Sequence, residues 1–230
     1  MIVVILAGGE GKRLRPYTQI FPKPLLPIGD KPILEIILER LKLQGIRDVF
    51  LSVNYKSHLI EQFFGNGADR GMNIIYSREE KPLGTGGPIK LLKDMLKEDF
   101  FVMNGDLITD IDVREVADFH KKTGADMTIV TKRIEIPISM GVINGKGDEI
   151  NAIEEKPVMK IEINTGMYML KPHVLEHMPD GEFFKITDLV EKIKNKGGKV
   201  ARFLHEGKWT DVGQINEYEE AQKEFYNKKD

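Results

Sequence analysis

The chain has 230 residues, 41% of them hydrophobic, which is enough to bury the core of one large α/β domain. Its 34 basic and 36 acidic residues leave a formal charge of −2, which argues against nucleic acid or a membrane surface as the main partner. The absence of cysteine excludes disulfides, thiolate metal sites and a cysteine nucleophile, and it is compatible with a reducing cytoplasm. Since no charged region precedes the N-terminal apolar stretch, and the stretch is too short to span a bilayer, we expect a cytoplasmic protein.

The first half of the chain alternates short β-rich runs with amphipathic segments. Strands are predicted at 2–6, 49–53, 73–77 and 100–103, and helices at 32–43, 57–64, 86–96 and 113–122. Such alternation is typical of an α/β domain in which helices cover both faces of a mostly parallel sheet. We therefore expect a three-layer α/β/α, Rossmann-like fold whose ligands bind beyond the carboxyl ends of the strands.

The second half begins with consecutive strands. Strands are predicted at 126–133, 140–143, 149–154, 161–170 and 199–204, and helices at 172–177, 186–196 and 214–226. This order predicts a mixed sheet that carries a small β lobe. With no repeat and no long linker, the economical division is one domain, 1–230, made of two functional halves at about 1–125 and 126–230.

A glycine-rich loop follows the first predicted strand, in the segment "VILAGGEGKRLRP" at 4–16. It is not a P-loop, because Leu6 stands where the first glycine is needed and Arg13 follows Lys12. It is not a dinucleotide fingerprint either, because Leu14 occupies its last glycine position. Glycines that free backbone N–H groups, followed by Lys12, Arg13 and Arg15, favour a polyphosphate cradle. The plainer alternative is a glycine turn with solvated basic residues.

The longer segment "LAGGEGKRLRPYT…PKPLLPIGDKPIL" resembles the sugar-1-phosphate nucleotidylyltransferases, also called nucleotide-sugar pyrophosphorylases. The resemblance continues in order through "LGTGGP", "MNGD", "EEKP", "INTGMY" and "KWTDVG", and so covers nearly the whole chain. Lys12 departs from the threonine that is commonest in this family's loop. The segment "PKPLLPIGDKPILE" is most similar to the branch of mannose- and heptose-1-phosphate guanylyltransferases.

This resemblance implies an enzyme that transfers a nucleoside monophosphate from an NTP to a sugar-1-phosphate and releases pyrophosphate. GTP is favoured, with UTP, dTTP and CTP as alternatives. The resemblance assigns two segments to nucleotide binding, a phosphate loop and a loop that lines the base and ribose. Their residues are Leu6, Ala7, Gly8, Gly9, Gly11, Lys12 and Arg13, and Leu83, Gly84, Thr85 and Gly86.

Four charged residues are the predicted catalytic set. Arg13 would grip the triphosphate with a planar fork, and Lys23, held between prolines, would contact the phosphates at the reaction centre. Asp106 follows a predicted core strand, and Asp211 lies in "KWTDVG". By resemblance these two carboxylates hold Mg²⁺, a cation that takes oxygen ligands and few of them from protein. Most aspartates in such positions are helix caps or turn residues, and only the pairing of the two favours a metal site.

The resemblance also assigns a sugar-phosphate site in the second half. Its residues are Gly141, Glu155, Lys156, Asn164, Thr165 and Gly166. Lys156 would neutralise the phosphate, while Glu155 and Asn164 would hydrogen-bond sugar hydroxyls. The implied partners are therefore small molecules, and a homo-oligomer is left open.

Two other functions remain as alternatives. One is a glycosyltransferase of related architecture, for which Asp110 and Asp112 would supply an acidic metal motif; we interpret them instead as the cap of the helix at 113–122. The other is a nucleotide-sugar-binding regulatory subunit without turnover. Such a subunit would be expected to have lost Arg13, Lys23, Asp106 or Asp211, and all four are present.

Overall fold

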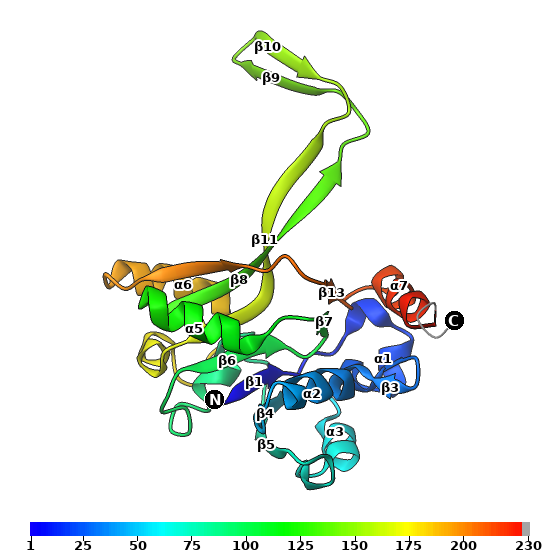
Figure 1. Ribbon diagram of the computed structural model, residues 1–230, viewed down its shortest axis with the longest axis vertical. Helices are drawn as coiled ribbons and strands as arrows, with labels where there is room; N and C mark the ends of the chain where they lie inside the picture. The colour runs from blue at the N-terminus through cyan, green and yellow to red at the C-terminus, as the bar shows by residue number, and fades with distance from the viewer. Residues whose placement is uncertain (227–230) are drawn as a thin grey trace.

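A computed structural model describes residues 1–226 as an α/β domain around a seven-stranded sheet (Figure 1). The strand order is β12-β8-β11-β6-β1-β4-β5. These strands are β1 Val3–Leu6, β4 Asp48–Val53, β5 Asn73–Arg78, β6 Phe100–Asn104, β8 Met127–Pro137, β11 Val158–Leu170 and β12 Val200–Leu204. Every neighbouring pair is parallel except those of β11, which runs antiparallel to β6 and β8. The predicted mixed, mostly parallel sheet is confirmed.

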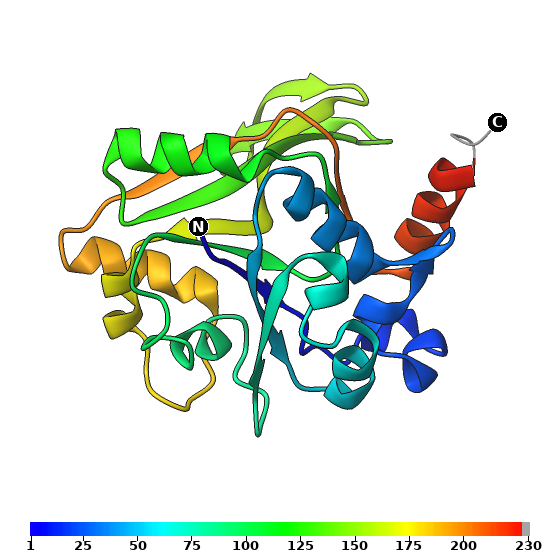
Figure 2. The same cartoon turned by 60° about the horizontal axis from the view of Figure 1, so that its bottom comes forward.

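Helices cover both faces of this sheet. The helices of the described chain are α1 Tyr17–Ile20, α2 Ile33–Leu43, α3 Ser57–Phe64, α4 Gly87–Lys90, α5 Val113–Thr123, α6 Leu189–Asn195 and α7 Ile215–Tyr226. Of these, α2, α3 and α5 pack on one face of the sheet and α4 and α6 on the other. In β1, Val3 and Ile5 belong to one buried cluster with side chains of α2, α3 and α5, whereas Val4 belongs to a second cluster with α4 and α6. Figure 2 shows α5 and α6 on opposite sides of the sheet. Because successive strand residues point to opposite faces, one short apolar run builds both cores.

The strand order reverses next to β1. From β1 the chain builds outward through β4 to β5, and β6 then returns to pair with the other side of β1. The loops that follow β1 and β6 therefore leave the same edge of the sheet in different directions. The place where the strand order reverses is called the switch point, and in sheets of this kind ligands bind there.

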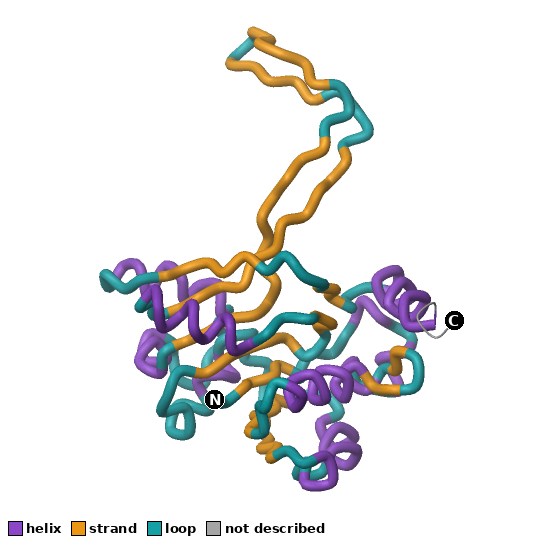
Figure 3. The backbone as a smooth tube through the Cα atoms, viewed as in Figure 1, coloured by secondary structure: helices purple, strands orange, loops and turns teal. Residues whose placement is uncertain are grey.

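Strands β8 and β11 are longer than predicted and leave the body as a two-stranded arm, which Figures 1 and 3 show as strand and loop without helix. The pairing of Ile134 with Ile161 and of Glu135 with Lys160 places apolar and charged pairs on alternating faces of the arm. Its tip is a smaller hairpin of β9, Val142–Lys146, and β10, Glu149–Glu154. This arm is the form that the predicted small β lobe takes.

Some elements differ from the expectation. The helix predicted at 86–96 is regular only over α4, and beyond Lys90 the hydrogen bonds are mostly of the tighter i→i−3 type, such as Leu92 N–H to the Ile89 carbonyl, at 3.0 Å. The segment at 172–177 is a 3₁₀ helix. Four very short strands and α1 were not predicted. The strands are β2 Pro27–Ile28, β3 Lys31–Pro32, β7 Leu107–Thr109 and β13 Trp209–Asp211. Among residues 1–226, no helix has both the length and the apolar character needed to cross a membrane.

Candidate active site

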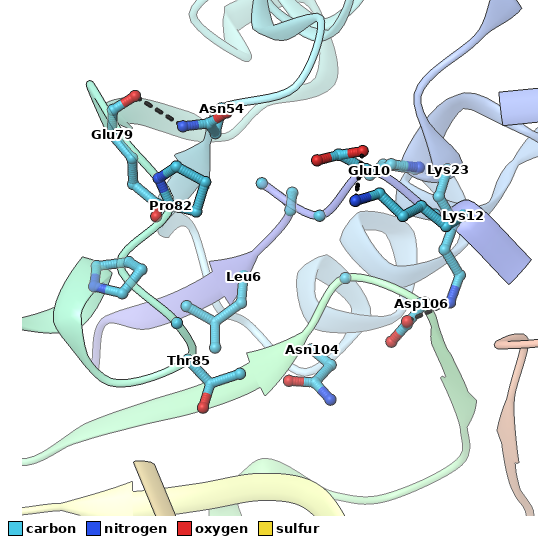
Figure 4. Close-up of a pocket in the computed structure, with 18 of the residues that line it drawn as sticks. Leu6, Glu10, Lys12, Lys23, Asn54, Glu79, Pro82, Thr85, Asn104 and Asp106 are labelled. Carbon is cyan, nitrogen blue, oxygen red and sulfur yellow. Dashed lines mark hydrogen bonds and ion pairs between the residues drawn. The ribbon is translucent and has the colours of Figure 1, made fainter. Parts of the chain in front are cut away.

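A cleft of about 550 Å³ opens where β1 and β6 end, at the switch point of the sheet. Figure 4 shows it with Glu10, Lys12, Lys23 and Asp106 toward one end and Asn54, Glu79 and Pro82 toward the other. The lining residues come from seven separate segments of the chain. They are Leu6–Arg13, Lys23, Pro24, Asn54, Glu79, Pro82, Gly84, Thr85, Pro88, Asn104–Asp106, Phe183 and Gly213.

The glycine loop lines the cleft, and close neighbours leave no room for a side chain at two of its glycines. A Cβ on Gly8 would lie 2.6 Å from the Glu79 Oε1 atom. Gly11 has φ +62°, and its Cβ would lie 2.8 Å from Thr18 Cγ2. Thr18 also donates a 2.8 Å hydrogen bond to the Gly11 carbonyl, which fixes the turn. The predicted loop residues from Leu6 to Arg13 all line the cleft, as a backbone cradle for an anion requires.

The basic residues of the cleft are held in different ways. Lys12 is exposed and lies 3.2 Å from the Glu10 carboxylate. Arg13 belongs to a 3₁₀ turn, Lys12–Leu14, that is anchored by the buried Leu14 side chain. A Cβ on Gly213 would lie 3.2 Å from the Arg13 Nη2 atom, so the guanidinium reaches the segment after β13. Lys23 is only 8% exposed, which is rare for lysine unless it is paired.

Lys23 is paired with the two predicted carboxylates. Its ammonium donates to Asp106 and lies 3.9 Å from the Asp211 Oδ1 atom. Asp106 follows β6, and Asp211 ends β13, which pairs with β7 so that Asp211 stands opposite Leu107. The Val212 N–H also donates a 3.0 Å hydrogen bond to the Asp106 carbonyl. Two aspartates more than a hundred positions apart are thus brought to one point, as the sequence predicted.

The two carboxylates suit a cation. The Asp106 Oδ1 and Asp211 Oδ1 atoms are buried and have no hydrogen-bond partner among the described residues. Burial, and after it the charge of Asp106, raises the pKa of Asp211 to about 6. Over residues 1–226 no group of three or more acidic or histidine side chains gathers to hold a metal. The donor set fits Mg²⁺, which takes few protein ligands and completes its shell with phosphate oxygens and water.

The loop at 83–86, which was predicted to line the base and ribose, lies partly in the cleft. Gly84 and Thr85 line it, whereas Leu83 is buried beneath and Gly86 donates its N–H to the Phe184 carbonyl, at 2.8 Å. Gly84 has φ +79°, and its Cβ would lie 2.6 Å from the same carbonyl oxygen. The loop is therefore fixed by the segment around Phe184, and Leu83 and Gly86 shape the cleft from behind.

The predicted sugar-phosphate residues fall into two groups. Asn164, Thr165 and Gly166 form the irregularity where β11 joins the body, and a Cβ on Gly166 would lie 2.5 Å from the Nδ2 atom of Asn104, a cleft residue. Gly141, Glu155 and Lys156 lie on the exposed arm and are absent from the cleft lining. Lys156 has φ +48°, unusual for a residue with a side chain. The role of all these residues in binding sugar stays a prediction.

Asp112 and Asp110 have structural partners. The Asp112 side chain accepts the Arg114 N–H at 2.9 Å and caps α5, as we interpreted it from the sequence. The Asp110 Oδ1 atom lies 3.0 Å from the His205 Nε2 atom. Neither aspartate lines the cleft.

The predicted site residues did not include ten residues of the lining, among them Asn54, Glu79, Asn104 and Phe183. Asn54, Glu79 and Asn104 each stand at or just after the end of a parallel strand, β4, β5 and β6, at the edge where ligands bind. That position was a usable signal. Phe183 comes from an irregular loop, and no sequence pattern marks it.

The chain is similar to known proteins over nearly its whole length. The family model for nucleotidyl transferase matches residues 2–228. The mannose-1-phosphate guanyltransferase of Candida albicans is 39% identical over 230 residues, covering 94% of this chain and 62% of that protein. The UTP–glucose-1-phosphate uridylyltransferase of Synechocystis is 33% identical over 244 residues, covering 96% of this chain and 62% of that protein. The chain thus spans 62% of the length of these curated relatives.

Among solved structures, HddC from Yersinia pseudotuberculosis complexed with GMP-PN superimposes with a TM-score of 0.77 and 28% identity. The match covers 97% of this chain and 99% of that chain. The family model extends over nearly the whole sequence. In the structure, Lys23, Asp106 and Asp211 meet at the switch point of the sheet. The chain belongs to the nucleotidyl transferase family.

Proposed function

We propose that this chain transfers a nucleoside monophosphate from an NTP, preferably GTP, to a sugar-1-phosphate, with release of pyrophosphate. The observation that carries the proposal is the meeting of Lys23, Asp106 and Asp211 beside the glycine loop and Arg13. The similarity to mannose-1-phosphate guanyltransferases makes mannose-1-phosphate the first sugar to test.

The reaction is an in-line attack of a sugar-phosphate oxygen on the α-phosphorus of the NTP. Two anions must approach each other, so the residues of the cleft have to position them and offset their repulsion. The backbone N–H groups of the glycine loop and the Arg13 guanidinium would hold the β- and γ-phosphates. The buried Lys23 ammonium, fixed between Pro22 and Pro24, would face the charge that develops at the α-phosphate.

We propose that Asp106 and Asp211 hold the Mg²⁺ ion. When bound, this ion would act as a Lewis acid that neutralises phosphate charge. The two buried Oδ1 atoms that lack hydrogen-bond partners support this assignment. Lys23 could then release one carboxylate and donate to phosphate instead. A cytoplasmic location and a homo-oligomer stay predictions.

The test is pyrophosphate release from each of GTP, UTP, dTTP and CTP, with Mg²⁺ and a panel of sugar-1-phosphates. We expect fastest release with GTP and mannose-1-phosphate or a related sugar, and none when Mg²⁺ is replaced by a chelator. A protein that consumes a nucleotide sugar without producing pyrophosphate would be a glycosyltransferase, and one that binds nucleotide sugars without turnover would be a regulatory subunit. Either result would overturn the proposal.

A further inference from the structure

The two aspartates assigned to Mg²⁺ are joined by a very short two-stranded ladder, β7 with β13, which Figure 1 shows side by side. Asp106 immediately precedes β7 and Asp211 ends β13, so both stand at the same end of this ladder. The ladder has three residue pairs, and Trp209 lies opposite Thr109 at its far end. Since so short a ladder is not stable by itself, contacts outside it have to set its alignment.

A buried histidine closes the far end of the ladder. His205 follows β12 and is 9% exposed, and its Nε2 atom lies 3.0 Å from the Asp110 Oδ1 atom and 3.2 Å from the Lys208 carbonyl oxygen. Both partners are acceptors, so Nε2 carries a proton and donates it. Asp110 directly follows β7 and Lys208 directly precedes β13. One imidazole N–H therefore bridges the two strands just beyond their last pair.

Other contacts gather at the same point. The Thr109 hydroxyl donates to the Lys208 carbonyl at 2.8 Å, and the Asp110 N–H donates to the same oxygen at 3.2 Å. A Cβ on Gly207 would lie 2.3 Å from the Asp110 Oδ1 atom and 2.7 Å from the His205 Cε1 atom. Only glycine at this position lets the turn before β13 close over the histidine and the aspartate.

The histidine is itself fixed to the main sheet. Its backbone N–H donates a 2.8 Å hydrogen bond to the carbonyl of Thr131 in β8. The ammonium of the next residue, Lys132, donates to the Gly207 carbonyl at 2.6 Å. The start of β13 is therefore held against the same seven-stranded sheet whose strand β6 leads to Asp106.

We propose that His205 and Asp110 form a positioning pair that sets the separation of Asp106 and Asp211, an inference that rests on the proposed function. Neither His205 nor Asp110 belongs to the described lining of the cleft, so the pair acts through the ladder. Asp211 lies two residues beyond Trp209 in an extended strand, which passes a displacement of one end on to the other. Asp110 thus serves the metal site as the partner of a histidine and not as a ligand.

Metal binding is the property most sensitive to this separation. Mg²⁺ requires oxygen ligands at about 2.0–2.1 Å in a nearly ideal octahedron, so two carboxylates that drift apart cannot both reach it. The glycine loop and Arg13, which are proposed to hold the NTP, belong to a different segment of the chain. Loosening the ladder should therefore weaken metal binding much more than NTP binding.

Variants of His205 separate positioning from mere stabilisation. His205→Leu removes the donor but stays apolar and bulky, whereas His205→Gln places an amide N–H₂ group near the position of Nε2 and should restore the bridge. Binding of Mn²⁺, a paramagnetic cation that takes the same oxygen ligands, would be measured by electron paramagnetic resonance without nucleotide. We expect His205→Leu to bind Mn²⁺ about tenfold more weakly than wild type, and His205→Gln to stay within about twofold of it.

Kinetics and a double variant complete the test. In His205→Leu, kcat for pyrophosphate release at limiting Mg²⁺ should fall about tenfold with little change in KM for GTP, and excess Mg²⁺ should restore most of it. Asp110→Ala should behave like His205→Leu, and the double variant should be little worse than either, since the two side chains act as a unit.

A second histidine–aspartate pair provides the matched control. The His173 Nε2 atom lies 3.3 Å from the Asp126 Oδ1 atom, and neither residue belongs to the described cleft lining. His173→Leu should leave Mn²⁺ binding and kcat at the wild-type values. An equal loss of Mn²⁺ affinity in this control would overturn the inference.

The remaining outcomes separate the pair from the proposed function. Unchanged Mn²⁺ binding in His205→Leu would overturn the inference whatever its melting temperature, and so would a loss in His205→Gln as large as in His205→Leu. If His205→Leu does not fold, Asp110→Ala gives the same test, because that side chain is 46% exposed. Mn²⁺ binding that depends on the pair, without sugar-dependent pyrophosphate release, would support the pair and overturn the transferase. Pyrophosphate release by a wild-type chain that binds no Mn²⁺ would leave the transferase standing and overturn the pair.

Discussion

Lys23 and Arg13 together balance the charges of Asp106 and Asp211 at the reacting end of the cleft. Burial of Lys23 is tolerable because both carboxylates are within 3.9 Å of its ammonium, one of them hydrogen-bonded. Burial, and after it the charge of Asp106, raises the pKa of the Asp211 carboxylate, while Lys23 acts in the opposite direction. A bound divalent cation would add the positive charge that a triphosphate and a sugar phosphate need.

Arg13→Lys should impair NTP use although it conserves charge. Lysine cannot reproduce the bidentate contact of a guanidinium with phosphate, and each lost charge-assisted hydrogen bond removes about 1.5–3 kcal/mol. We expect kcat/KM for the NTP to fall about tenfold to a hundredfold, measured in steady-state kinetics of pyrophosphate release. Arg15→Lys is the matched control, because Arg15 is exposed and outside the cleft lining. Equal kinetics in the two variants would remove Arg13 from the phosphate site.

The raised pKa of Asp211 predicts how stability depends on pH. The folded state holds this proton more tightly than the unfolded chain, in which the pKa of aspartate is about 3.9. The contribution to the free energy of unfolding is therefore fully present below about pH 4 and is lost as pH rises through about 6, where the folded pKa lies. Solvent reduces the effect, because the side chain is 38% exposed.

Thermal melts of the metal-free protein between pH 4 and pH 8 would measure this effect. Asp211→Asn cannot ionise, so its melting temperature should decline less with pH than that of wild type. The control Asp148→Asn changes an exposed aspartate at the arm tip and should follow wild type. Adding Mg²⁺ should stabilise wild type above pH 6 and have little effect on Asp211→Asn. Parallel curves for wild type and Asp211→Asn would contradict the assignment.

At the scale of elements, a short link from β4 to α3 braces the segment that follows the glycine loop. The Tyr55 hydroxyl donates to the Thr18 carbonyl at 3.1 Å, and the Lys56 ammonium donates to the carbonyls of Gln19 and Ile20 at the end of α1. Lys56 has φ +52°, in the left-handed region of the backbone. Because Thr18 in turn holds Gly11, this link connects the sheet edge to the phosphate loop through α1.

Lys56→Met should weaken the brace, because it removes the ammonium group while keeping a long unbranched side chain. We expect a loss of about 0.5–1.5 kcal/mol in unfolding free energy, the usual contribution of a hydrogen bond, and a several-fold rise in KM for the NTP. Urea denaturation and steady-state kinetics measure the two effects. Lys31→Met removes an exposed amine paired with Glu39 and should leave the KM unchanged. A stability loss in Lys56→Met without any change in KM would show that the brace does not position the loop.

At the scale of the whole molecule, the arm is the part least attached to the core. Its residues from 138 to 157 contribute almost no buried side chain, and beyond the body β8 and β11 pair only with each other. Isolated two-stranded hairpins are marginally stable in water, so the arm depends on the sheet that carries it. It also holds Gly141, Glu155 and Lys156, the residues predicted to bind sugar phosphate.

Replacing residues 138–157 with Asn-Gly tests that prediction. Pro137 and Val158 face each other in the β8–β11 pair, so a two-residue turn can join them. We expect the melting temperature and GTP binding to stay close to those of wild type, and sugar-dependent pyrophosphate release to be lost. The double variant Glu155→Gln with Lys156→Met should reproduce most of the loss in an intact arm. Normal turnover in both variants would exclude the arm from the sugar-phosphate site.

Much of the fold was predictable because local patterns and the global sheet agree. The run at 2–6 is apolar at every position, as a strand buried on both faces must be, and the alternation that follows predicted β1, β4, β5 and β6 with the helices between them. The glycine loop, Lys23 and the strand-end Asp106 were also visible in sequence, because their chemistry lies in short contiguous segments.

Tertiary structure alone decided the features that depend on distant pairings. The three-residue strands β7 and β13 carry too few residues for a periodic signal, yet their pairing places Asp211 beside Asp106 and Lys23. The alternation of apolar and polar residues in β8 and β11 predicted strands, but it could not show that these strands continue beyond the body as an arm. The same two-residue period occurs in a two-stranded hairpin and in a strand packed within a larger sheet. Glu79 lies in a polar stretch without a motif, and only the folded chain brings it against Gly8 and the cleft. Sequence therefore determined the residues that carry the chemistry, while the side of the sheet and the distance at which they meet were set by contacts between segments far apart in the chain.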